Sequence, residues 1–165
     1  MIRKNPDETY MSICFAYPDL YEVGMPFQGF QQLYHIVNTE KTFGAERVFA
    51  PWTDMEDALR SNKIPLFSLE NQRPVHSFDV LGFTLQYEMT YTNILNMLDL
   101  SHIPVRSADR NDSNPFVIAG GSCVYNPEPL VPFIDAFVIG DAEDIIVPLL
   151  KRIQKGKKTG SPRLQ

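Results

Sequence analysis

The chain has 165 residues, of which 44% are hydrophobic and 21% are charged, a length and composition typical of one globular domain with its own core. Residues 1–150 contain nine basic and twenty acidic residues, a net charge of −11, which argues against nucleic-acid binding because that function favours a basic face. No apolar run approaches the roughly 20 residues that span a bilayer, and the N-terminus has no signal-peptide pattern. We therefore expect a soluble, cytoplasmic protein without a membrane partner.

Short apolar runs alternate with amphipathic segments along the chain. Residues 11–17 form a predicted buried strand, and residues 27–38 form a predicted helix whose apolar side chains recur at the spacing of a face that packs on a sheet. A second strand is predicted over residues 47–50. Thr53 or Asp54 is a suitable N-cap for the helix that follows.

The same alternation continues to the end of the chain. A third strand is predicted over residues 79–85 and a helix over residues 90–101. Strands over residues 116–120 and 136–139 follow, and a last helix is predicted over residues 142–154.

Five strands that alternate with helices predict an α/β fold with a parallel sheet and helices on both faces. We expect a three-layer, flavodoxin-like (Rossmann-like) domain with five strands in the order 2-1-3-4-5. The predicted organisation is an N-terminal extension (residues 1–9), the α/β domain (residues 10–154) and a basic linker (residues 155–165), which has linker composition. The long connections over residues 63–78 and 122–135 are predicted to be functional, because long ordered loops in a compact domain often are.

Glycine turns close the last two predicted strands. Gly120, Gly121 and Ser122 follow the fourth strand, and Gly140 begins a Gly-Asp-Ala-Glu turn after the fifth. Ligands of parallel sheets sit beyond the carboxyl ends of the strands, and glycine allows backbone to approach a ligand closely. These turns therefore predict part of a cleft floor, for which tight strand-to-helix turns are the alternative explanation.

Familiar nucleotide sites and catalytic sets are absent from the sequence. The first loop lacks the Gly-x-Gly-x-x-Gly spacing of a dinucleotide site, and the chain has no Walker lysine motif. No lysine lies between Lys63 and Lys151, which excludes the fifth-strand lysine of a phospho-receiver domain. Cys14 and Cys123 have no metal-ligand spacing, and the three histidines belong to no Ser-His-Asp set. We predict neither a metal site nor a catalytic residue in this chain.

The loop after the first strand has the form Asp-x-Tyr-x-x-Gly, from Asp19 through Tyr21 to Gly24. It resembles the Asp-x-His-x-x-Gly loop of flavodoxin-like cobalamin-binding domains, in which the histidine ligates cobalt and the aspartate orients the imidazole. Tyr21 stands where those domains have histidine. Because a phenol is a poor ligand to a transition metal at neutral pH, the resemblance implies cobalamin binding without a protein ligand below cobalt.

A closer resemblance covers roughly residues 10–150. The chain resembles the N-terminal, cobalamin-binding-like domain of a family of uncharacterised radical SAM proteins, in its segments YPDLYEVGM, ERVFAPW, IPLFSLE, LQYE, YTNILNMLDL and NPEPL. The resemblance implies a parent protein in which a radical SAM barrel follows this domain. That barrel holds a four-iron four-sulfur cluster (4Fe-4S) on a Cys-x-x-x-Cys-x-x-Cys motif and cleaves S-adenosylmethionine, and this chain contains no such motif.

The expected function is thus that of a cofactor- or substrate-covering domain of a radical SAM enzyme, with that barrel as its partner. Two alternatives stay open: a degenerate module that only docks on the barrel, and an independent α/β protein that binds a small molecule. The residues predicted to bind the cofactor lie at the carboxyl ends of the strands and are Asp19, Tyr21, Gly24, Thr84, Gln86, Tyr87, Gly120, Gly121, Ser122, Gly140, Asp141 and Glu143.

Overall fold

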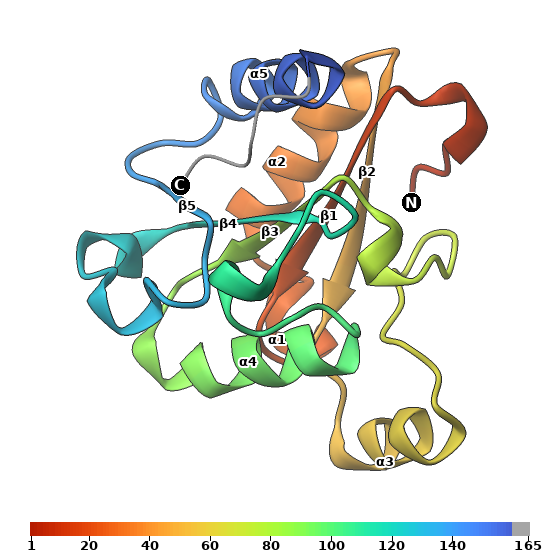
Figure 1. Ribbon diagram of the computed structural model, residues 1–165, viewed down its shortest axis with the longest axis vertical. Coiled ribbons are helices and arrows are strands. Elements are labelled where there is room, and N and C mark those ends of the chain that lie inside the picture. Colours follow the sequence, from red (N-terminus) through yellow and green to blue (C-terminus); the bar gives the residue numbers. More distant parts are fainter. Residues whose placement is uncertain (160–165) are drawn as a thin grey trace.

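The protein is built on one parallel β-sheet with helices on both faces (Figure 1). The structure, a computed structural model, describes residues 1–159. Its strands lie in the order β2-β1-β3-β4-β5 and every adjacent pair is parallel; they are β1 (Met11–Tyr17), β2 (Phe43–Phe49), β3 (Val80–Thr84), β4 (Phe116–Gly120) and β5 (Ala136–Val138). The predicted fold class and strand order are confirmed.

The helices divide between the two faces of the sheet. The short α1 (Tyr21–Gly24) and α2 (Gln28–Thr39) follow β1, and α2 lies beside α5 (Ile146–Thr159) on one face. On the other face, α4 (Tyr91–Leu100) buries Ile94 and Leu98. Each face has its own cluster of buried apolar side chains, so the sheet is the shared wall between two halves of the core.

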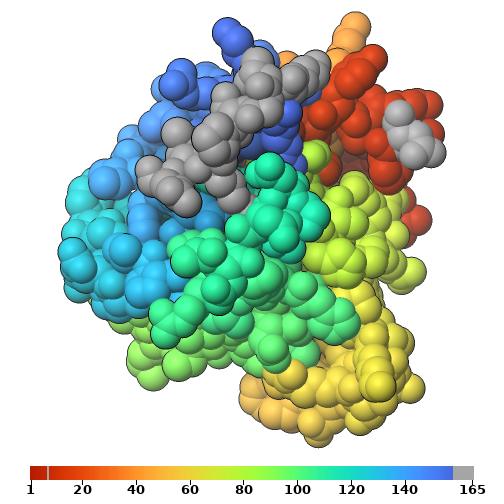
Figure 2. All heavy atoms as spheres, in the orientation of Figure 1, coloured from red at the N-terminus to blue at the C-terminus, as the bar shows by residue number. Residues whose placement is uncertain are grey.

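Helix α3 (Thr53–Asn62) stands apart from this arrangement. Leu59 is its one buried residue, and Figure 2 shows the helix as a projection at the lower end of the molecule. Arg60 of α3 donates to Asn96 and Asp99 of α4 and also to Glu56 on its own helix. These exposed polar contacts attach the helix without a substantial apolar interface.

Two predicted boundaries were wrong. Strand β2 begins at Phe43, four residues before the predicted start, because Gly44 and Ala45 pair with β1 although they carry no strand pattern of their own. Helix α5 covers residues 146–159, whereas we predicted 142–154. Residues 142–145 form a bend and a turn instead, and residues 155–159 of the predicted linker are helical. Residues 160–165 of that linker lie outside the described residues.

The connection over residues 63–78 covers the outer edge of β2. Leu69 donates its backbone N–H to the carbonyl of Arg47 at 2.7 Å, and the Glu70 carboxylate accepts the N–H of Arg47 at 2.7 Å. Glu70 also forms an ion pair of 2.8 Å with the Arg47 guanidinium, and both side chains are buried. Since an unpaired strand edge invites association with other chains, this segment protects the sheet. Its predicted functional role stays a prediction, and the contacts of Leu69 and Glu70 give this segment a packing role.

The connection over residues 122–135 also contributes to packing. Its two 3-10 turns, Ser122–Tyr125 and Glu128–Leu130, bury Val124 and Leu130 in the core on the α4 face. Ile134 joins the same cluster.

Candidate functional site

A cavity of about 240 Å³ lies over the carboxyl-terminal half of the sheet, on the face that α2 and α5 cover. Its floor consists of residues from β1, β3, β4 and β5, and its walls come from the first turns of α2 and the turn that leads into α5. The lining residues are Phe15, Phe27, Gly29, Phe30, Leu33, Gly82, Phe83, Thr84, Gln86, Ile118, Gly120, Gly121, Val138, Gly140, Asp141, Ala142, Glu143 and Ile146.

The cavity exists because residues without side chains occupy its floor and wall. Gly82 lies in register between Phe15 of β1 and Ile118 of β4, at the centre of the floor. Gly120 pairs with Thr84 and Val138 at the end of β4, and Gly29 lies on the α2 wall. A glycine inside a strand often marks a place where a ligand or another backbone approaches closely. A Cβ at Gly120 would lie at an ordinary contact distance of 3.7 Å from Val138, whereas a Cβ at Gly82 or Gly29 would lie 3.3 Å from a neighbouring side chain.

Gly121 has a structural role that explains its presence without any ligand. Its φ of +114° and ψ of −175° lie in a region that glycine alone adopts readily, and a Cβ there would lie 2.5 Å from the carbonyl oxygen of Leu85. Leu85 in turn donates its N–H to the carbonyl of Gly120 and accepts the N–H of Cys123. This close crossing joins the ends of β3 and β4.

Gly140 differs from Gly121. Its φ is +98°, but no atom lies within 4 Å of the position of a Cβ. The space beside Gly140 belongs to the cavity mouth, so here both the turn geometry and the open space favour glycine.

The structure brings seven of the twelve predicted binding residues together around this cavity: Thr84, Gln86, Gly120, Gly121, Gly140, Asp141 and Glu143. The other five, Asp19, Tyr21, Gly24, Tyr87 and Ser122, do not line it. Ser122 instead donates its hydroxyl to the carbonyl of Gln86 at 3.0 Å. This placement is geometric, and ligand binding by the seven residues remains a prediction.

Asp19 and Tyr87 form a pair of their own beside the cavity. The Tyr87 hydroxyl donates to the Asp19 carboxylate, which joins the loop after β1 to the loop after β3. This hydrogen bond, with smaller contributions from burial and from the negative charge of Asp19, raises the pKa of Tyr87 to about 12. Asn93 at the start of α4 donates to the carbonyl of Pro18 at 2.9 Å and holds the same loop. The Asp19 carboxylate is therefore engaged with Tyr87.

Tyr21 and Gly24 lie on the side of α1 that faces β2. The Tyr21 ring packs edge-on against Phe49, with 5.2 Å between the centroids, and the residue is 47% exposed. A Cβ on Gly24 would lie 2.6 Å from the Tyr17 ring and 2.8 Å from the Phe49 ring. Close packing of rings thus accounts for Gly24.

Sequence reasoning missed the α2 wall and the centre of the floor. Phe30 and Leu33 were predicted only to pack on the sheet, and Phe27, Gly29 and Gly82 were not selected as site residues. The available signal was that Gly29 lies among the apolar residues of a helix and Gly82 lies inside an apolar strand.

Residues 29–165 match the protein family described as radical SAM proteins, N-terminal. The chain belongs to this family. It is also 30% identical over 96 residues to an uncharacterized protein of Methanocaldococcus jannaschii, a match that covers 56% of this chain and 20% of that protein. The chain thus spans about a fifth of the length of this curated relative. The predicted family resemblance is confirmed.

The cavity of this radical SAM N-terminal domain is apolar inside and acidic at its mouth. Among the described residues that line it, Asp141 and Glu143 are charged, and none is lysine, arginine or histidine. Within residues 1–159, no group of three or more histidine, cysteine, aspartate or glutamate side chains is placed to hold a metal ion. The same part of the chain contains no helix both long and apolar enough to cross a bilayer.

Proposed function

We propose that the chain is the ligand-holding N-terminal domain of a radical SAM enzyme and that its cavity receives the ring-bearing end of a cofactor, with cobalamin as the candidate. The observation that carries this proposal is the cavity, which lies where seven predicted residues converge. The proposal assigns the 4Fe-4S cluster and S-adenosylmethionine to a radical SAM domain outside this chain.

The size and lining of the cavity suit a bicyclic ring. An apolar protein cavity of about 150 Å³ binds benzene, so a volume of about 240 Å³ is suitable for a fused pair of rings such as the benzimidazole of the cobalamin tail. Phe15, Phe30 and Ile118 supply apolar surface, and the glycines of the floor leave room for a flat group. The acidic mouth suits a ligand whose inserted end is uncharged.

Cobalamin bound here would have no protein ligand below cobalt. The residues that line the cavity include no histidine, and the Tyr21 ring packs against Phe49. When bound, cobalamin supplies a cobalt centre able to carry an alkyl group. The residues of this chain would hold its tail, keep water from the apolar part of the cavity and orient the ring system over the carboxyl ends of the strands.

A titration of the chain with two corrinoids tests the proposal. Hydroxocobalamin carries the nucleotide tail, and cobinamide lacks it. We expect a change in the visible spectrum with hydroxocobalamin, at least tenfold weaker binding of cobinamide, and a spectrum without the signature of histidine coordination. Equal affinities for the two corrinoids would contradict insertion of the tail into the cavity.

A substitution at the cavity floor tests whether the ligand occupies the cavity, and a substitution outside the cavity is its control. A Cβ at Gly120 would lie 3.7 Å from Val138, an ordinary contact distance, so Gly120→Val should fold and should fill part of the cavity. We expect this variant to lose cobalamin binding, whereas Gly156→Ala on α5, outside the cavity, should retain it. Unchanged binding by Gly120→Val would place the ligand elsewhere.

The docking-only alternative has one observation in its favour. The Asp19 carboxylate stands where the similar cobalamin-binding domains have the aspartate that orients the cobalt-ligating histidine, and here it accepts a hydrogen bond from Tyr87. Absence of a spectral change with either corrinoid at millimolar concentration would favour this alternative.

A further inference from the structure

The exposed apolar side chains of the protein gather at one end of the sheet. Of thirteen large hydrophobic residues that are exposed in the described part of the chain, nine lie in the segments that follow the carboxyl ends of the strands. They are Tyr21, Val23, Trp52, Met55, Tyr87, Met89, Tyr125, Ile139 and Ile145. We call this surface the carboxyl face. Exposure is greatest at Met89 (87%), Tyr125 (75%) and Trp52 (63%).

The charged side chains of the carboxyl face are all acidic. Its five segments, residues 18–27, 50–55, 85–91, 121–127 and 139–145, contain seven carboxylates and no lysine, arginine or histidine. The carboxylates around these apolar side chains repel nucleic acid and anionic lipid. It suits a protein partner with an apolar centre and a basic rim.

The loops of this face are fixed to one another. Tyr87 bonds Asp19, Asn93 bonds the carbonyl of Pro18, and the N–H of Ala50 donates to the carbonyl of Asp19 at 3.0 Å. These contacts connect the segments after β1, β2 and β3. Since a surface already in its bound conformation loses less entropy on association, this rigidity is suited to docking.

We propose that the carboxyl face is the docking surface for the radical SAM domain of the same protein. This inference rests on the proposed function. Three observations favour this occupant: the family is defined as the N-terminal part of radical SAM proteins, the relative extends well beyond the matched region, and the cavity mouth at Gly140–Glu143 belongs to the same face. A partner seated here closes the mouth over a bound ligand.

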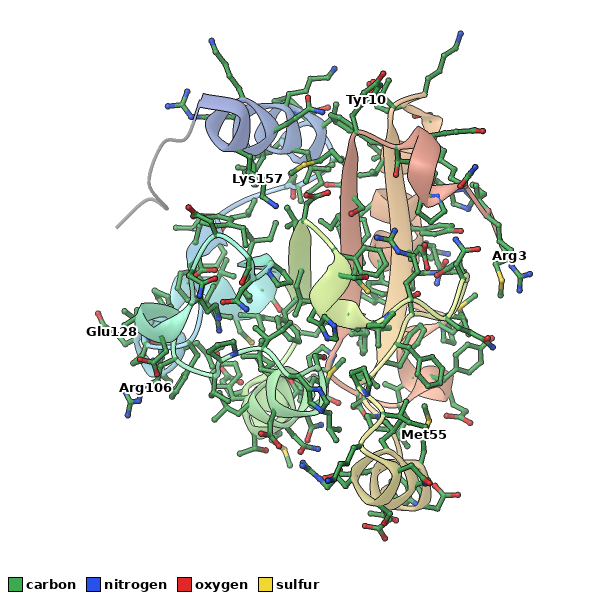
Figure 3. The ribbon with its side chains drawn as sticks, turned by 45° about the vertical axis from the view of Figure 1, so that its right-hand side comes forward. Arg3, Tyr10, Met55, Arg106, Glu128 and Lys157 are labelled. Carbon is green, nitrogen blue, oxygen red and sulfur yellow. The ribbon has the colours of Figure 1, made fainter. Side chains whose placement is uncertain are left out.

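The path of α5 adds a geometric requirement. Lys157 contacts Asp79, which precedes β3, so α5 carries the chain to the opposite end of the sheet (Figure 3). Docking on the carboxyl face therefore requires a connecting segment that runs from the end of α5 back to the carboxyl ends of the strands. That distance is about the length of a seven-residue strand, roughly 23 Å at about 3.3 Å per residue.

Hydrogen–deuterium exchange on the full-length protein that the gene encodes tests the proposal. We expect exchange in the five segments of the carboxyl face to slow at least tenfold relative to the chain that ends at Gln165. Segments at the opposite end, around Tyr10 and Asp79, should change less than twofold. Equal exchange rates in the two proteins, or a gene that encodes no radical SAM domain, would overturn the proposal.

Exposed residues at the two ends of the molecule provide matched variants. Met89→Ser combined with Tyr125→Ser should remove most of the protection in the full-length protein, because both side chains are exposed and their loss should leave the fold intact. Tyr10→Ser is the control, since Tyr10 is 71% exposed but lies at the other end of the sheet (Figure 3). Equal loss of protection in the control would overturn the proposal. So would protection that appears in the isolated chain as its concentration rises, because that result assigns the face to a second copy.

The corrinoid titration on the isolated chain separates this inference from the proposed function. Tail-dependent cobalamin binding without protection of the face would overturn docking alone. Protection of the face without corrinoid binding would overturn the ligand proposal and retain docking.

Discussion

At the scale of single residues, two glycines with positive φ angles have different reasons for their conformation. Gly121 lies against the backbone of Leu85, whereas Gly140 lies beside open space. Both positions strain any residue with a Cβ, at a cost of about 1–3 kcal/mol. An alanine at Gly121 would in addition overlap a carbonyl oxygen at 2.5 Å.

Gly121→Ala should therefore destabilise the protein more than Gly140→Ala. We expect a loss of at least about 3 kcal/mol for Gly121→Ala and about 1–2 kcal/mol for Gly140→Ala, measured by urea unfolding. Equal losses would show that the Leu85 contact does not constrain the turn.

The Asp19–Tyr87 hydrogen bond leads to a prediction about titration. The pKa of Tyr87 is raised to about 12, so Asp19→Asn should return it toward the ordinary value near 10. The absorbance of the tyrosinate ion measures this change, and Tyr87→Phe identifies the titrating residue. Because the pKa is higher in the folded than in the unfolded chain, the stabilisation from this hydrogen bond is complete below pH 10. It is lost as the pH rises through 12.

Single residues also mark the limit of sequence reasoning about the site. The turns at Gly121 and Gly140 were predictable because short apolar runs end in glycine. The partner of Asp19 was not, since Tyr87 lies 68 residues away and no local pattern connects the two loops. The positions of Gly29 and Gly82 in the cavity lining could not be predicted, because they depend on how α2 packs on the sheet.

At the scale of elements, the outer edge of β2 depends on a buried ion pair. Arg47 is 2% exposed and Glu70 is 1% exposed, and Glu70 bonds both the backbone and the side chain of Arg47. The Arg47 guanidinium also lies over the Tyr34 ring at 4.1 Å. Removal of one partner from such a pair leaves an uncompensated charge in the core.

Glu70→Ala should consequently lower the free energy of unfolding by about 3–5 kcal/mol. Glu56→Ala removes a partly exposed partner of the exposed Arg60 and should cost less than about 1 kcal/mol. Urea unfolding of the two variants measures the contrast. A small effect of Glu70→Ala would contradict the role of residues 63–78 as the cover of β2.

Elements were predicted best where the pattern of apolar residues was strong. Strand β1 and helix α2 have such patterns, and their observed bounds agree with the prediction to within one or two residues. The start of β2 was missed because Glu46 is a charged residue at a buried strand position, where Ser68 and Asn71 bond its carboxylate. Those partners lie in a connection that sequence alone did not place beside the strand.

At the scale of the whole molecule, the larger part of the hydrophobic core and the candidate site lie on opposite faces of the sheet. The α4 side of the sheet has the larger buried cluster, whereas the α2–α5 side contains the cavity. The exposed apolar side chains and the carboxylates concentrate at the carboxyl ends of the strands. A domain shaped only by its own stability would fill this cavity and cover these side chains.

That separation predicts a conflict between stability and binding at Gly120. Valine there adds methyl groups beside the apolar side chains of the cavity, and cavity-filling substitutions commonly raise stability by about 0.5–2 kcal/mol. Gly120→Val should accordingly unfold at a higher temperature than the original chain while it loses the increase in unfolding temperature that cobalamin produces. Thermal unfolding with and without hydroxocobalamin measures both effects on the same samples. A variant that is less stable and still responds to the ligand would show that Gly120 serves the turn rather than the cavity.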